Sequence, residues 1–139
     1  MAEKKIDEKK AQELYMELNM INQQIQEYQK QIQQFEETIQ EVRESKKSLD
    51  EISVLEEGKE ILLPIVSGIF AKAEIKNTKE FIVNVGANTA VEKPVDDVKK
   101  LLDKQLEEIQ KTQNNFVDNL QKLTVQSQKL KKEMESSMG

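Results

Sequence analysis

The stretch that decides the fold is residues 58–94, GKEILLPIVSGIFAKAEIKNTKEFIVNVGANTAVEKP. It contains every internal glycine and both prolines of the chain: Gly58, Gly68, Gly86, Pro64 and Pro94. The long polar segments on either side contain neither residue type until the terminal Gly139. Because glycine and proline interrupt helices, the layout predicts a helix over residues 1–57, a small β unit over 58–94 and a second helix over 95–139.

Within the central stretch, short apolar runs alternate with turn residues. The runs predict strands at residues 60–66, 69–76, 81–85 and 89–92. Tight turns at Ser67–Gly68 and Gly86–Asn88 would join them as two hairpins. Pro64 cannot donate to a strand ladder, so it is expected at an edge, a strand end or a bulge.

Such a meander has one apolar face and little of its own chain to cover that face. We therefore expect it to assemble with copies of itself or with a sister chain. The residues expected to make this oligomerisation surface are Ile61, Leu63, Ile65, Ile69, Phe70, Ala71, Ala73, Ile75, Phe81, Val83, Val85 and Val91.

The first polar segment carries a seven-residue apolar repeat. From Ala11 to Leu49 the apolar residues recur in steps of three and four, and Lys46 is the single polar residue at the repeat positions. A mean spacing of 3.5 keeps one narrow seam facing a partner helix, which is typical of a left-handed coiled coil. A helix over residues 8–52 would be on the order of 65 Å long.

The second polar segment resumes the seam after Pro94, with Asp96 and Asp97 at the expected helix start. Polar residues interrupt it at Gln105 or Lys99, and again at Gln113 and Ser127. Because the β unit returns the chain, the two helices should pair antiparallel.

Paired residue numbers in the two helices would then sum to roughly 150. This register places Phe35 opposite Phe116, Tyr28 opposite Leu123, Leu18 near Leu130 and Met134, and Lys46 level with Gln105. Polar residues facing each other within a seam disfavour slipped pairings.

Composition excludes several functional classes. Charged residues make up 34% of the chain and hydrophobic residues 37%, which suits long exposed helices better than a globular core. The net charge is -5, so a nucleic-acid partner is not expected. Cysteine and histidine are both absent, and no motif suggests a nucleotide loop. We therefore expect no enzyme activity, no catalytic residue, no metal site and no cofactor.

The chain has no apolar run long enough to span a membrane, and its first residues lack the apolar core of a signal peptide. A cytoplasmic protein without a membrane partner is expected.

Three motifs in the central stretch carry a family resemblance. Leu62–Ile65 is similar to an L-V-P-V/I strand, Ile69–Ala73 to S-F-I-K-A/G, and Val83–Ala87 to V-S-V-G-A/S. Together with the two long helices, they make the chain resemble the α-type subunit of prefoldin, a hexameric co-chaperone of archaea and eukaryotes. The sequence departs from the family at residues 66–69, where the family usually has a run such as G-A-G-S.

The resemblance implies an α+β fold: a long antiparallel two-helix coiled coil with two central β-hairpins that form an oligomeric β-barrel. It also implies a hexamer of two α-type and four β-type subunits. Members of the family are ATP-independent holdases, which capture non-native proteins between the free tips of their coiled coils and pass them to the group II chaperonin. A structural coiled-coil scaffold or tether is the alternative function.

Applied to this chain, the resemblance places client binding at the start of the first helix and the end of the second. Methionine is unbranched and adaptable, as promiscuous binding surfaces require. Seam residues such as Leu18 and Leu130 have a second interpretation, which is that they only close the coiled coil. The candidate client-binding residues are Leu14, Tyr15, Met16, Leu18, Met20, Leu130, Met134 and Met138.

Overall fold

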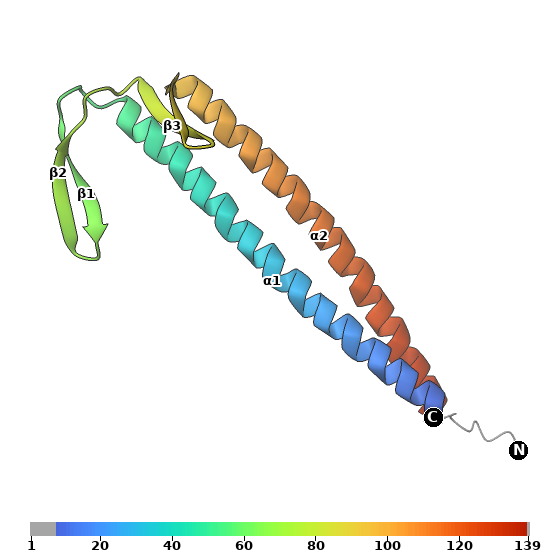
Figure 1. The fold of residues 1–139 in the computed structure, drawn as a ribbon. Helices are drawn as coiled ribbons and strands as arrows, with labels where there is room; N and C mark the ends of the chain where they lie inside the picture. The colour runs from blue at the N-terminus through green and yellow to red at the C-terminus, as the bar shows by residue number, and fades with distance from the viewer. Residues whose placement is uncertain (1–7, 139) are drawn as a thin grey trace, which may run out of the picture. The chain divides into compact units, whose positions relative to one another are not determined.

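The computed structural model describes residues 8–138, without the side chains of residues 137 and 138. It contains two long helices and, between them, two β-hairpins (Figure 1), which confirms the order predicted from the sequence. The elements are α1 (Glu8–Ser53), β1 (Glu60–Val66), β2 (Ile69–Glu74), β3 (Glu80–Gly86), β4 (Thr89–Pro94) and α2 (Val95–Met138).

The observed strand ends differ from the predicted ones by one or two residues. Strand β2 ends at Glu74 instead of residue 76, and Ile75 bonds to the two residues that precede β1. The amide of Ile75 donates to the carbonyl of Lys59 at 3.1 Å, and its carbonyl accepts from the amide of Gly58 at 2.6 Å. Ile75 therefore ties the exit of the first hairpin to the segment that enters it.

Each hairpin is a separate two-stranded antiparallel sheet. In β1–β2 the register shifts between Pro64 and Val66, which places Pro64 beside a β-bulge. Bulges are positions where a strand tolerates a residue that cannot donate. Gly68, with a φ of 82°, then closes the two-residue turn.

The β3–β4 turn has Ala87 and Asn88 as its central residues, with φ values of 51° and 58°. Positive φ at both central positions defines a type I′ turn, whose twist matches that of a hairpin. Asn88 suits this conformation, whereas Ala87 adopts it against the steric preference of a residue with a Cβ. The side chain of Asn84 stabilises the turn by accepting a 2.9 Å hydrogen bond from the amide of Gly86.

The chain divides into two compact units, Met1–Thr38 with Ile109–Gly139 and Ile39–Glu108. Each unit contains facing stretches of α1 and α2. In the first unit the rings of Phe35 and Phe116 make an edge-to-face contact with centroids 5.1 Å apart. Ser127 in the same unit lies 3.3 Å from the side-chain oxygen of Asn22.

In the second unit Lys46 forms an ion pair with Asp103, and Lys99 forms one with Asp50. All of these pairs have residue numbers summing to about 150, the register predicted for an antiparallel coiled coil. The predicted partner of Lys46 differs from the observed one, since Gln105 is exposed and Asp103 takes its place. Asp103 offers a carboxylate that pairs with the lysine charge, whereas the amide of Gln105 is neutral.

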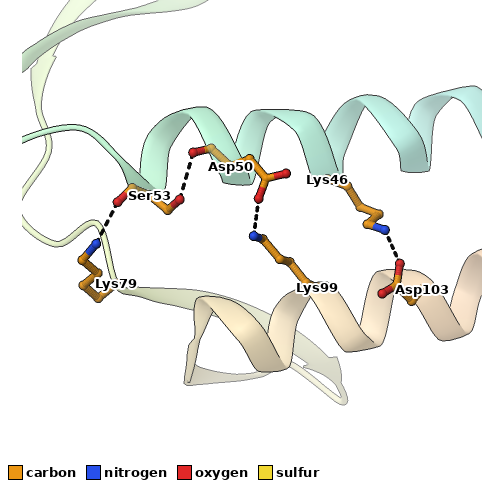
Figure 2. Close-up of polar contacts among 6 residues, drawn as sticks. All are labelled: Lys46, Asp50, Ser53, Lys79, Lys99 and Asp103. Atoms are coloured by element: carbon orange, nitrogen blue, oxygen red, sulfur yellow. Dashed lines mark hydrogen bonds and ion pairs between the residues drawn. The ribbon is translucent and has the colours of Figure 1, made fainter.

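The segment between the hairpins joins the two helix ends of the second unit (Figure 2). The ammonium group of Lys79 donates to the carbonyl of Ser53, the last residue of α1, at 2.9 Å. The carbonyl of Lys79 accepts from the amide of Val95, the first residue of α2, at 2.9 Å. A cation at the C-terminal end of a helix also opposes the negative end of its dipole. Lys79 thus stabilises one helix end with its side chain and another with its backbone.

Because of the ion pair between Lys99 and Asp50, we expect the folded protein to lose stability at alkaline pH. The hydrogen bond to Asp50 is the largest effect and raises the pKa of Lys99 above its ordinary value of 10.5. Desolvation opposes this shift, and the charges of Asp50, Asp96 and Asp103 add to it. A raised pKa stabilises the folded state below the unfolded value, and this stabilisation is lost as the pH rises through the folded value. The melting temperature should therefore fall above about pH 10.5, with a shallower fall in Lys99→Met.

The exposed neighbour Lys100 provides the matched control, because Lys100→Met removes the same charge from the same turn of α2. Melting curves from pH 9 to about pH 11.5 compare the three proteins. Identical alkaline slopes for the wild type and Lys99→Met would show that this pair does not cause the loss of stability at alkaline pH.

Candidate functional site

The first unit has a small apolar core in its seam. Leu14, Ile21 and Leu130 are buried there, and Leu18, Ile25, Leu123 and Met134 pack against them while remaining half-buried. Four of the candidate client-binding residues, Leu14, Leu18, Leu130 and Met134, thus lie in the coiled-coil seam, where they hold the two helices together.

Three further candidates lie on the surface of the same unit. Tyr15 is 57% exposed, Met16 63% and Met20 59%. We call these three residues the terminal patch. The side chain of the remaining candidate, Met138, lies outside the part of the chain that the structure describes.

The heptad positions explain why the two methionines of the terminal patch are exposed. With the seam of α1 at positions a and d, Met16 occupies an f position and Met20 a c position, which point away from the partner helix. Every later c and f position of α1 is polar: Gln23, Glu27, Lys30, Gln34, Glu37, Glu41, Glu44, Ser48 and Glu51. Apolar side chains on this face are therefore confined to one end of the helix, where they contribute nothing to the seam.

The first hairpin exposes apolar side chains on both of its faces. The strand register places Ile61, Leu63, Ala71 and Ala73 on one face, joined by Val66 and Ile69 beyond the bulge. The other face carries Leu62, Pro64 and Phe70 beside Lys72. The expectation of a single apolar face is therefore wrong for β1–β2. Ile69 is 58% exposed and Phe70 57%. In the single chain this hairpin therefore leaves a large part of its apolar surface in contact with water.

The predicted oligomerisation residues fall into two groups by exposure. Leu63, Ile65, Ile69, Phe70 and Val85 are exposed, whereas Ile61, Ala71, Ala73, Ile75, Phe81, Val83 and Val91 are half-buried. Three exposed apolar residues of the hairpins were not predicted: Leu62, Val66 and Ile82. Their signal in the sequence is a large apolar residue at a strand position where alternation calls for a polar one.

Phe81 of β3 is turned toward the helices of its own unit. It lines a shallow groove of about 590 Å³ together with Leu49 and Ile52 of α1 and Val98 and Leu102 of α2. Val98 is buried although it lies outside the predicted seam. The second hairpin therefore borders this groove of the coiled coil through Phe81, whereas the apolar surface of the first hairpin is exposed.

Within residues 8–138, no group of three acidic side chains is arranged to hold a metal ion. No helix in that range is long and apolar enough to cross a membrane. The terminal patch and the exposed apolar surface of the hairpins are the candidate functional surfaces described above.

Comparison with known proteins agrees with this geometry. The family model described as "Prefoldin subunit" matches residues 21–138. The prefoldin subunit alpha of Thermofilum pendens is 36% identical over 91 residues, which cover 66% of this chain and 67% of the relative. That of Methanococcus maripaludis strain C5 is 32% identical over 111 residues, covering 80% and 75%.

A solved structure has a similar fold. The cryo-EM structure of filamentous PFD from Methanocaldococcus jannaschii aligns with a TM-score of 0.76, covering 84% of this chain and 96% of that chain. The two sequences are 20% identical, so this likeness concerns the fold alone.

Proposed function

This chain belongs to the prefoldin family, and from that membership we propose that it is an ATP-independent holdase subunit. In this proposal the ends of the coiled coils capture non-native proteins, and the assembled complex passes them to the group II chaperonin. The hairpins join this chain to β-type subunits in a complex of two α-type and four β-type chains.

The observation that carries the proposal is the terminal patch. Met16 and Met20 occupy f and c positions, where apolar residues do not stabilise a coiled coil, so their presence there requires another explanation. Tyr15 offers a rigid amphipathic ring, while Met16 and Met20 can adjust to apolar segments of different shapes. A surface of this kind suits a binder that must accept many unfolded sequences.

Assembly supports capture by bringing several weak surfaces together. Each terminal patch is small, so one arm would hold a client only weakly. Linking several arms raises the effective concentration of the second and later contacts. The exposed apolar residues of β1–β2, above all Ile69 and Phe70, are suited to join the chains because each is more than half exposed in the single chain.

The proposal predicts that the terminal patch can be inactivated without unfolding the arm. The triple variant Tyr15→Ser, Met16→Gln, Met20→Gln should require about tenfold more complex to suppress the aggregation of a denatured client, since three apolar contacts are lost. The measurement is light scattering of a chemically denatured protein diluted into the assembled complex without ATP.

The matched control is Gln23→Ser, Glu27→Gln, Lys30→Gln. It changes three c and f positions of the same helix further along the same face and leaves the net charge unchanged. It should suppress aggregation as the wild type does. Equal suppression by the patch variant and the wild type would contradict client binding at this patch.

The same aggregation measurement tests the alternative function. A structural scaffold or tether would use the hairpins for assembly and the seam for rigidity, and both are untouched in the patch variant. Such a protein would assemble but show no suppression even in the wild type.

A further inference from the structure

Among the side chains that the structure describes, the sulfur atoms of Met16, Met20 and Met134 all lie at one end of the coiled coil. The chain has five methionines and no cysteine, and the methionines are Met1, Met16, Met20, Met134 and Met138. Residues 21–133 therefore contain no sulfur. The antiparallel pairing brings Met134 to the end of α1 that carries Met16 and Met20, where it packs against the core of Leu14, Ile21 and Leu130.

Met16 and Met20 lie in different surroundings from Met134. Met16 and Met20 are 63% and 59% exposed, whereas Met134 is half-buried against the apolar core. Because Met16 and Met20 are four residues apart on a helix, their thioethers are neighbours on one surface. An oxidant in solution can reach both sulfurs without any opening of the helices.

We propose that Met16 and Met20 form an oxidant-sensitive modification site, at which a hydroperoxide converts the thioethers to sulfoxides and thereby weakens client capture. This inference rests on the proposed function of the terminal patch. It adds a regulation by oxidants that requires no cysteine.

The chemistry is a two-electron oxygen transfer. The methionine Sδ attacks the terminal oxygen of hydrogen peroxide, an S–O bond forms as the O–O bond breaks, and the departing hydroxide leaves as water after gaining the proton of the transferred OH. Sulfur is oxidised, and peroxide is reduced to water. The product is a polar sulfoxide in place of an apolar, flexible thioether.

The position of the two residues determines which property changes. Their c and f positions face away from the seam, so two sulfoxides there leave the contacts between α1 and α2 intact. The patch itself loses the apolar character on which capture depends. Oxidation should therefore reduce binding while the arm stays helical and the complex stays assembled.

The test exposes the assembled complex to hydrogen peroxide, quenches it with catalase and then measures three quantities. Peptide mass spectrometry gives the sulfoxide fraction at each methionine, native mass spectrometry gives the assembly, and light scattering gives aggregation suppression. Met16 and Met20 should oxidise several-fold faster than Met134. Suppression should fall several-fold as they do, with the mass of the complex otherwise unchanged.

Each complex is compared with its own untreated sample, so that the readout is the ratio of suppression after and before peroxide. The variant Met16→Leu, Met20→Leu should give a ratio near one, and Met134→Leu should give the wild-type ratio. A wild-type ratio near one with both sulfoxides fully formed would overturn the inference. So would an equal loss in the double leucine variant, which would place the sensitive sulfur elsewhere in the complex.

The untreated samples separate this inference from the proposed function. If the untreated wild-type complex does not suppress aggregation, the holdase proposal fails and the regulation built on it fails with it. If the untreated complex suppresses and the oxidised one does so equally, only the regulation fails.

Discussion

Replacing Phe116 with alanine should lower the free energy of unfolding by about 3 kcal/mol. Phe116 is the centre of an aromatic cluster, since its ring contacts both Tyr28 and Phe35 with centroid separations of 5.1 Å in each pair. Both contacts are edge-to-face, which adds to the stability gained from burial alone. Urea denaturation followed by circular dichroism of the full chain measures the effect.

Two controls make this result specific. Phe116→Leu keeps most of the apolar volume and should cost about 1 kcal/mol. Asn119→Ala changes an exposed residue of the same helix and should stay within about 0.5 kcal/mol of the wild type. A Phe116→Ala protein as stable as the wild type would show that the helices do not pair in this register.

The second large effect is expected on assembly. Ile69→Asp places a carboxylate on the exposed apolar face of β1–β2, and burying that charge in a subunit interface would cost several kcal/mol. Mixed with a β-type subunit, the wild-type chain should give a native mass of two α-type and four β-type chains. The Ile69→Asp chain should give none of this species.

Ser67→Asp is the control, because it adds the same charge to the exposed turn of the same hairpin. It should assemble as the wild type does. Ile69 is exposed in the single chain, so the variant should also keep its helical circular dichroism. Normal assembly of Ile69→Asp would mean that this face of the hairpin does not join the subunits.

The helices and their pairing could be predicted from the sequence because the information is periodic and repeated. Twelve seam positions agree on one face of α1, and the aromatic residues Phe35 and Phe116 mark the level at which α2 crosses it. A slip of one heptad would break this contact and the ion pair between Lys99 and Asp50 at once. Many weak preferences that share one register make the prediction robust.

The details of the β unit could not be predicted in the same way. Each strand is short, so only a few residues show the alternation of apolar and polar positions. Leu62 and Phe70 break this alternation because both faces of β1–β2 are apolar. Thr78 is buried in the segment between the hairpins, and Val98 is buried although the predicted seam did not include it. Val98 lies three residues after Val95 and four before Leu102, so it fits the seam spacing, whereas no repeat marks Thr78.

The candidate site could also be predicted only in part from the sequence. The heptad repeat predicts the exposure of Met16 and Met20, since they occupy f and c positions and every later f and c position of α1 is polar. The sequence pattern alone does not separate Leu14 and Leu130 from the patch, because seam residues near a helix end could pack or bind. The structure buries both residues in the apolar core of the first unit.

Site-specific photo-cross-linking tests the central claim most directly. A benzophenone amino acid is placed at position 16, or at position 30 as a matched f position, in chains assembled with the β-type subunit. Each complex is then irradiated with a denatured client in the absence of ATP. A client adduct should form from position 16 and none from position 30. Equal adducts from both positions, or an adduct from position 30 alone, would contradict capture by the terminal patch.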